Sequence, residues 1–500
     1  MFKKILTKLI KTKQASHLVT DGYILISTLV FATIGVIILN GLASWSAMNY
    51  KLAIQTVDRE KAFQIAEAGV DYYRWHLAHA PLDFQDGTAT SGPYIHSYND
   101  KLGNLIGQFS LVITPPSVGS SVVKIVSKGT VASTTISRSI EVILAVPSLA
   151  KYAFVANSMM RFGEGTEIFG PVHSNDGIRM DGLAHNIVSS AKASYYDPDN
   201  NGKLEFGVHT HVQAPPSTGT SEGGLKEEEA SNSSVPVRTD IFEAGRQFPV
   251  PAVDFIGFTQ KLSDLKTLAQ ADGQYFPSSG SQGYNIVLKT NGTFDLYQVT
   301  SLVSAKKSCY KPNMDDQDGW GSWSVNKESF IANYAYPVNG IIFIEDNIWV
   351  EGQINNNRLM IASGKFPESE TTQTSISFTK DILYTNYDGR DVLALIAQNN
   401  INAGMTSTDI IEIDASLIAK NGRAGRYYYN SSCSPYNNRT KIRLYGMIVS
   451  SMRYGFAYTG TQGSGYETRE IVYDGNLLYG PPPFFPLIGD HYVTISWREI

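Results

Sequence analysis

Cysteine is scarce in this chain of 500 residues, which contains only Cys309 and Cys433. Two cysteines exclude a disulfide-rich scaffold, and neither belongs to a CxxC pair of the kind that binds zinc. In an oxidising compartment the two thiols can join in one disulfide, whereas otherwise they remain two unpaired buried thiols. Because the sequence does not give their separation in space, both interpretations stay open.

Charged residues make up only 17% of the chain, and basic residues are not in excess. The 41 lysines and arginines against 46 aspartates and glutamates give a net charge of −5, which argues against a nucleic-acid partner. The sequence also lacks GxSxG, HExxH and a phosphate-binding loop. Its 28 tyrosines favour a β-rich extracytoplasmic protein. These features together favour a protein that is not an enzyme.

A long charge-free stretch near the N-terminus is the clearest signal in the sequence. It runs from Gly22 to Tyr50, and residues 23–42 read YILISTLVFATIGVIILNGL. Twenty such residues can cross a bilayer as a helix. Five lysines precede the stretch, so we expect a single pass through the inner membrane with a cytoplasmic N-terminus and an exported C-terminal region. A cleaved secretory signal and an uncleaved signal anchor are the alternatives.

The helical pattern continues beyond the apolar stretch. Apolar side chains recur at steps of three and four residues, at Phe63, Ala66, Val70, Tyr73 and Leu77. This spacing marks one face of an amphipathic helix, and the next proline is Pro81. The sequence therefore predicts one helix over residues 23–80 that begins apolar and becomes amphipathic.

This N-terminal region resembles that of PilX-type minor pilins of type IV pili. Gly22-Tyr23 stands before the apolar stretch, and AFQIAEAG at 62–69 matches the end of the family's N-terminal domain. The resemblance covers about residues 15–80. It implies that residues 1–22 are a leader, which prepilin peptidase removes between Gly22 and Tyr23. It also implies the membrane and other pilin subunits as partners.

Ser27 is a departure from that family. Counted from Tyr23 it is the fifth residue, where major pilins carry a glutamate that meets the free amine of the subunit ahead. A carboxylate in hydrocarbon is costly unless it is paired. Its replacement by serine implies a subunit that caps a filament or one that never enters it.

The remainder of the chain predicts a mainly β fold after the long helix. Alternating patterns at 105–146 predict a small antiparallel β domain over 81–147 that packs on the helix. For residues 148–500 we expect a large β-rich head. Its recurrent unit is an apolar strand followed by an Asn- or Asp-rich corner, at 172–182, 343–352, 395–404 and 416–422. Such corners favour a β-solenoid over a sandwich.

An insertion, a helix and the tail complete the predicted head. Residues 215–238 are rich in Ser, Gly and Glu with Pro at both ends, which predicts a flexible insertion. Residues 252–272 predict a helix whose apolar stripe packs on the core. We expect the final strand of the chain to close the edge of the same core.

The best candidate for a metal site is the run from Asp197 to Glu205. Asp197, Asp199 and Asn201 stand at alternate positions, as at the front of a calcium loop. The position of the usual bidentate glutamate holds Val208, so the alternatives are a partial Ca²⁺ loop completed by distant oxygens and a solvated turn. The sequence requires no cofactor.

Other polar clusters give weaker signals. His209 and His211 share a strand face, but two histidines do not define a zinc site. Asp315, Asp316 and Asp318 form a second acidic turn. A carbohydrate-active site needs paired carboxylates or a carboxylate and a base, which His173, Asp176, Asp181 and His185 would supply if the corners brought them together. A structural role at the corners is favoured for these four residues.

The functional prediction is a membrane-anchored minor pilin-like subunit. Its head would stand outside the membrane, at the tip of a pilus or on the cell surface, and bind an unknown surface ligand in adhesion or assembly. The alternatives are a membrane-anchored carbohydrate-active enzyme with a solenoid domain and a static cell-envelope protein.

Overall fold

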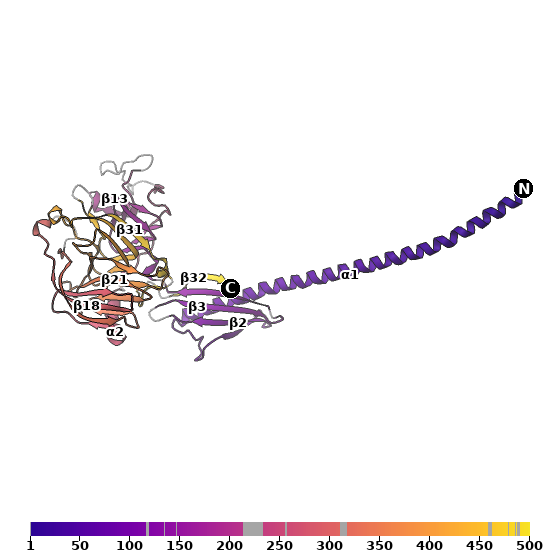
Figure 1. Cartoon of the computed structure of the whole chain (residues 1–500), viewed down its shortest axis with the longest axis horizontal. Helices are drawn as coiled ribbons and strands as arrows, with labels where there is room; N and C mark the ends of the chain where they lie inside the picture. Colours follow the sequence, from indigo (N-terminus) through magenta and orange to yellow (C-terminus); the bar gives the residue numbers. More distant parts are fainter. Residues whose placement is uncertain are drawn as a thin grey trace. The chain divides into compact units, whose positions relative to one another are not determined.

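The computed structural model divides the chain into two compact units, each of which is described by itself (Figure 1). It describes residues 2–116, 120–134, 136–146, 148–213, 234–255, 258–310, 318–458, 463–478, 480–485, 487 and 491–500, with only the backbone for 2–22 and 258–261. The first unit comprises residues 1–114, 125–142 and 496–500, and the second comprises 115–124 and 143–495. Most of the insertion predicted at 215–238 lies outside the described residues.

The first unit begins with the single helix α1 (Phe2–His79), as the sequence predicts for residues 23–80. It ends just before Pro81, since a proline disfavours helical backbone at the residue before it. The buried face consists of Ala62, Ile65, Ala66, Val70, Tyr73 and Leu77. Phe63, at the edge of this face, packs edge-on against Trp497. The predicted apolar stripe therefore faces the core. The centre of the buried face lies at Ala62 and Ala66 rather than at Phe63.

A small antiparallel sheet covers this face of α1. Its strand order is β1-β2-β3-β4-β32, and β1 runs antiparallel to β2. Alternate residues of β3 are buried and exposed, which is the pattern of a strand with one face on a core. The bounds are β1 (Tyr94–Asn99), β2 (Leu105–Thr114), β3 (Val123–Val131), β4 (Ser137–Ala145) and β32 (Val493–Glu499).

Glycines allow the sheet and the helix to touch through their backbones. A Cβ atom at Gly129 would overlap with the backbone of Ala62 and Ala66. A Cβ atom at Gly69 would overlap with the side chains of Ser127 and Phe109. The alanines and the glycine of AFQIAEAG therefore lie where the helix crosses β2 and β3 most closely.

We expect Gly129→Val to destabilise the first unit by about 2–3 kcal/mol, because the backbone on the other side cannot yield as a flexible side chain would. Urea unfolding of the purified full chain in detergent, followed by the hydrogen exchange of the β3 amides, measures this effect. Lys128→Ala is the matched control, since Lys128 is the exposed neighbour on β3. Equal unfolding midpoints for the two variants would contradict the close packing.

The last strand of the chain corrects the prediction for the tail. We expected it to close the core of the large region, but β32 lies beside β4 in the small sheet. Ion pairs between Arg498 and Glu141 and between Arg138 and Glu499 hold it there. The Ile500 amide also donates a hydrogen bond of 3.0 Å to the Ser139 carbonyl oxygen. These partners are distant in sequence, so no local pattern reveals the pairing.

The second unit is a solenoid of parallel strands, as the corner repeats favour. In its first row, each strand pairs in parallel with the next. The order is β16 (Gln274–Phe276), β20 (Ile341–Ile344), β22 (Arg358–Ser363), β25 (Val392–Ala397), β27 (Ile410–Ala419), β29 (Asn438–Ser450), β5 (Phe154–Ala156), β8 (Val172–Ser174), β11 (Val188–Ser190) and β15 (Arg246–Gln247).

Two further rows form the other sides of the coils. The second row contains β17 (Gly283–Leu288), β21 (Ile348–Ile354), β23 (Ile376–Phe378), β26 (Ile401–Ala403) and β28 (Ala424–Gly425), and separately β6 (Met160–Phe162), β9 (Ile178–Met180) and β14 (Val208–His209). The third row contains parts of β21, β27 and β29, with β24 (Ile382–Tyr384), β31 (Ser464–Tyr473), β7 (Thr166–Phe169) and β10 (Leu183–Ala184).

The order of the coils in space differs from their order in the sequence. β29, from the last coils of the chain, pairs with β5, from the first, so that Ile448 lies beside Phe154. The chain enters the solenoid in its middle, winds to β15 at one end, and resumes with β16 at the other. The first row continues across this junction through β29 and β5, and the third row continues through β31 and β7.

Both faces of the central strands of the first row, from β20 to β5, are buried. Inward side chains such as Ile342 and Leu395 belong to the core inside the coils. Outward side chains such as Phe343 and Met360 lie in a second core, which Leu262 and Leu265 of helix α2 (Phe258–Asp272) help to cover. This double burial explains why these strands are almost continuously apolar.

Candidate functional site

The apolar part of α1 is the first functional feature of the structure. Large apolar side chains from Tyr23 to Tyr50 are exposed, and the helix from Tyr23 is long and apolar enough to cross a membrane, with a mean hydropathy of 2.2 in its most apolar window. A continuous apolar surface of this size requires a lipid or protein partner. The described unit supplies none for this part of α1, because none of that window is buried.

The residues of the predicted cleavage site lie inside this helix. α1 passes through Gly22 and Tyr23 without a break, and the side chain of Tyr23 is exposed. The Ser27 hydroxyl donates a hydrogen bond of 3.0 Å to the Ile24 carbonyl oxygen. Ser27 therefore satisfies its polar group within its own helix and needs no charged partner from another subunit.

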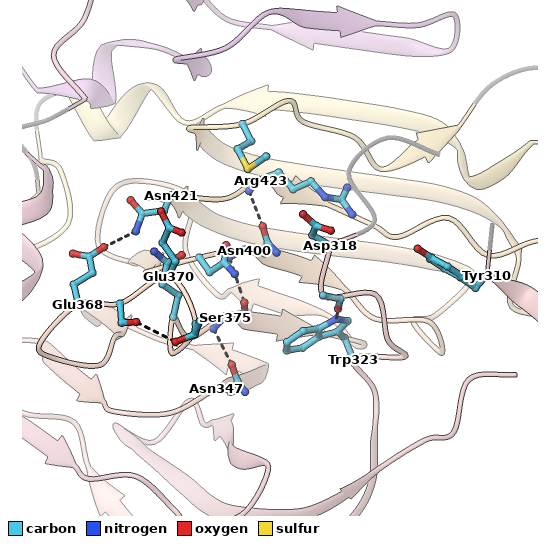
Figure 2. Close-up of a pocket in the computed structure, with 16 residues that line it drawn as sticks. Tyr310, Asp318, Trp323, Asn347, Glu368, Glu370, Ser375, Asn400, Asn421 and Arg423 are labelled. Atoms are coloured by element: carbon cyan, nitrogen blue, oxygen red, sulfur yellow. Dashed lines mark hydrogen bonds between the residues drawn. The ribbon is translucent and has the colours of Figure 1, made fainter. Parts of the chain in front are cut away.

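The second feature is a polar cleft of about 1030 Å³ in the solenoid (Figure 2). The corners between the first and second rows form one side, where Asn347 lies between β20 and β21 and Asn400 lies between β25 and β26. The Asn347 Oδ1 accepts a hydrogen bond of 2.9 Å from the Ser375 amide, and the Asn400 Oδ1 accepts one of 2.8 Å from the Arg423 amide. The asparagines predicted at the corners thus join successive coils and line the cleft.

Aromatic residues and acids form the rest of the cleft. Tyr310, Trp323 and Asp318 line it on one side, and Glu368 and Glu370 line it on the other (Figure 2). The combination of flat rings with amides and carboxylates suits a ligand that carries both hydroxyl groups and an apolar face.

Glu368 is a charged group of this cleft. Partial burial alone would raise its pKa, but hydrogen bonds from Lys420 and Asn421 keep the pKa below its usual range. The Lys420 Nζ lies 2.7 Å from the Glu368 Oε2. Glu368 is therefore an anion that accepts hydrogen bonds at neutral pH, and it is a poor general acid.

A disulfide joins Cys309 to Cys433, with 5.5 Å between their Cα atoms. It lies in a small core with Tyr427 and Tyr429. The Tyr427 hydroxyl donates a hydrogen bond of 2.8 Å to the Asp318 carbonyl oxygen. The disulfide therefore fastens the segment that carries the aromatic side of the cleft to the coils.

The structure separates the four predicted calcium ligands into two pairs. Asp199 and Asn201 are exposed, and Asp199 forms ion pairs with Arg453 and Arg161. Asn201 takes a left-handed conformation with a φ of 52° at the end of a short 3₁₀ helix. Asp197 and Glu205 are fully buried. These four residues therefore do not form one loop around a common centre.

The buried pair instead meets the two histidines of the VHTH sequence. The Asp197 Oδ2 lies 3.5 Å from the His209 Nε2, and the Glu205 Oε1 lies 3.5 Å from the His211 Nε2. Burial alone would raise the pKa of Asp197, but His209, the Asp199 amide and Arg179 hold it below its usual range. The spacing of His209 and His211 is the sequence signal for this cluster, whereas the pattern around Asp197 and Glu205 predicts a calcium loop instead.

The remaining candidates are dispersed in the structure. His173 is buried against Ser189, and burial lowers its pKa. Asp181 accepts a hydrogen bond of 2.7 Å from Arg179. His185 lies between Glu167 and Glu243. Each of these three side chains is thus engaged in separate local contacts. Asp315 and Asp316 lie outside the described residues, whereas Asp318 lines the cleft.

Comparison with known proteins gives a structural likeness but no match in sequence. No protein-family model and no curated protein matches the chain. The crystal structure of the competence-associated pilin ComZ from Thermus thermophilus is similar over 89% of this chain and 98% of that one, with 12% sequence identity and a TM-score of 0.33. A likeness at this TM-score assigns neither a family nor a function to the chain.

Proposed function

We propose that the chain is a membrane-anchored, pilin-like subunit that displays a solenoid head outside the inner membrane. The observation that carries the proposal is the division of α1 into two parts. Its first part exposes a charge-free apolar surface long enough for a bilayer, and its second part packs on a small antiparallel sheet. A helix of this kind can leave the membrane for a filament, because either environment covers the apolar surface.

The finer proposal is a minor subunit of the PilX type at the tip of a type IV pilus or a related filament. It rests on Gly22-Tyr23, on AFQIAEAG and on Ser27. Prepilin peptidase and other pilin subunits are the partners that it requires. The neutral Ser27 supports a terminal position, because the subunit then needs no amine from a subunit ahead of it.

We further propose that the cleft binds a surface ligand rich in hydroxyl groups and does not convert it. The chain would then act in adhesion, and the ionised Glu368 supports binding rather than acid catalysis. A glycan-binding assay on the purified full chain with product analysis separates binding from turnover. Product formation would support the membrane-anchored enzyme instead.

The anchoring proposal has a direct test in cell fractionation. We expect the chain to stay in the membrane pellet after an alkaline wash and to appear in small amounts in filaments sheared from the cells. The double variant Ile34→Lys/Ile38→Lys introduces charges into the exposed apolar surface and should not stay in the membrane pellet. Leu102→Lys/Leu105→Lys, at exposed positions of the first unit, is the matched control. Release of the unmodified chain by the wash would contradict anchoring.

A further inference from the structure

We propose that Asp197, Glu205, His209 and His211 bind a divalent transition-metal ion, with Zn²⁺ as the best fit. The four side chains come from one short stretch of the chain, residues 197–211, on β12 (Ser194–Asp197), β13 (Lys203–Phe206), β14 and the residues directly after it. One ligand atom from each of Asp197, His209 and His211 lies within 4.8 Å of the others. This inference is independent of the proposed role in a pilus.

The local fold explains how the four side chains meet. β12 and β13 form an antiparallel hairpin in which Tyr195 lies opposite Glu205. Residues two apart on a strand share a face, so that Asp197 and Glu205 point to the same side of the hairpin as Tyr195. The Tyr195 ring packs against His209, with 5.5 Å between the ring centres. The carboxylates are thereby turned toward the histidines of the solenoid coil.

The histidines are held by the coil itself. His209 lies beside Arg179 in the parallel pairing of β14 with β9. The His211 amide donates a hydrogen bond of 3.0 Å to the Asp181 Oδ1. The two rings lie 5.0 Å apart between centres. His209 and His211 therefore present their ring nitrogens from a rigid backbone.

The distances are those of metal ligands rather than of hydrogen bonds. A good N–H···O hydrogen bond is about 2.9 Å long, whereas the two histidine-to-carboxylate distances are 3.5 Å. Ligands about 2.1 Å from a tetrahedral Zn²⁺ lie about 3.4 Å from each other. Each pair therefore has the separation of two ligands of one ion. The ligand atoms of Asp197, His209 and His211, which lie within 4.8 Å of one another, would draw together around that ion, and Glu205 would join them through its position beside His211.

The cluster also leaves polar atoms without partners. Among the described residues, neither ring nitrogen of His209 has a hydrogen-bond partner. The same is true of the His211 Nε2, the Asp197 Oδ2 and the Glu205 Oε2. All four residues are at least 97% buried. Burial of so many unpaired polar atoms is costly unless an ion binds them. The other carboxylate oxygens are oriented by the protein, because the Asp197 Oδ1 and the Glu205 Oε1 accept hydrogen bonds from the Asp199 amide and the Asn200 side chain.

The ligand set selects the ion and its role. Two imidazole nitrogens favour Zn²⁺ over Ca²⁺ or Mg²⁺, which prefer sites made of oxygen atoms. Four protein ligands in a buried site are typical of a structural metal centre, since a catalytic zinc keeps one position for water. We infer that the ion fastens the hairpin of β12 and β13 to the coil that contains β14.

Metal analysis of the full chain, purified in detergent after growth with zinc, tests this site. We expect about one Zn²⁺ per chain, and Co²⁺ in its place should give the intense visible absorption of a tetrahedral ion. His209→Gln/His211→Gln should weaken zinc binding at least about 100-fold. Asn200→Ala should weaken it about 10-fold, because Asn200 orients Glu205.

His185→Gln is the matched control, because His185 also contacts two carboxylates but is partly exposed and hydrogen-bonded to both. It should leave the zinc content unchanged. Glu205→Gln keeps the shape of the side chain, and we expect it to alter the Co²⁺ spectrum while the circular dichroism of the protein stays the same. A folded chain without stoichiometric zinc, or a Co²⁺ spectrum unchanged by Glu205→Gln, would overturn the proposal.

Discussion

Removal of the disulfide by Cys309→Ala/Cys433→Ala is expected to lower the free energy of unfolding of the second unit by about 4 kcal/mol, since the bond closes a loop of more than 100 residues in the unfolded chain. The two cysteines are 124 positions apart. Urea unfolding of the purified full chain, with and without reductant, measures the difference.

The same variant should also alter the cleft. Tyr427 and Tyr429 pack with the disulfide, and their hydroxyls donate hydrogen bonds of 2.8 and 2.7 Å to the carbonyl oxygens of Asp318 and Gly321. We expect faster hydrogen exchange in residues 318–324 once the bond is absent. Ser432→Ala, at an exposed position beside Cys433, should change neither property. Unfolding that is insensitive to reductant in the unmodified chain would contradict the prediction.

Asp414→Asn is expected to stabilise the protein at neutral pH by up to about 3 kcal/mol and to have little effect near pH 4. Asp414 is fully buried on β27. It accepts hydrogen bonds of 2.9 Å from the Tyr384 amide and 2.7 Å from the Tyr387 hydroxyl. Burial raises its pKa to about 6, although these hydrogen bonds oppose the increase.

The sign of the pH dependence follows from that pKa. The folded protein binds a proton on Asp414 more tightly than the unfolded chain, whose aspartates titrate near 3.8. As the pH rises from about 4 to about 6, the contribution of Asp414 to stability therefore falls. The variant should lose this part of the pH dependence. Burial also raises the pKa of Asp474, and the contribution of Asp474 to the pH dependence should remain in the variant.

Urea midpoints between pH 4 and pH 8 test this expectation. Asp388→Asn is the control, because Asp388 lies in the neighbouring loop but is exposed and paired with Arg390. A wild-type chain whose stability rises steadily from pH 4 to pH 6, with the same slope in Asp414→Asn, would show that Asp414 does not titrate as proposed.

The features that the sequence predicts well are those with a local pattern. The charge-free stretch from residue 22 to 50 and the spacing of Ala66, Val70 and Tyr73 define α1, because helical periodicity involves near neighbours only. The solenoid follows from its corners in the same way. Asn347 and Asn400 each stand where one strand ends and the next begins, and each accepts a backbone hydrogen bond from the following coil.

Features that depend on pairing between residues far apart in the chain cannot be predicted from local patterns in the sequence. No pattern in residues 493–499 indicates that they pair with β4, because Arg498 and Glu141 meet only in the folded chain. The junction of β29 with β5 is hidden for the same reason, since Ile448 and Phe154 are far apart in the chain. The sequence around Gly69, the glycine of AFQIAEAG, likewise does not indicate that this residue lies against Ser127 of β3.

The cluster proposed to bind a metal ion is an intermediate case. All four proposed ligands are near one another in sequence, but the alternate spacing of Asp197 and Asp199 matched a calcium loop instead. The decisive fact is that Asp199 turns outward to Arg453, which is 254 positions away. Only the hairpin, which places Glu205 opposite Tyr195, shows that the carboxylates face His209 and His211.

The mature N-terminus, determined by mass spectrometry of protein from its native membrane, tests the central claim most directly. The proposed pilin-like role predicts a chain that begins at Tyr23, with residues 1–22 removed after Gly22. A chain that retains Met1 would contradict prepilin processing and leave α1 as a plain membrane anchor for the solenoid.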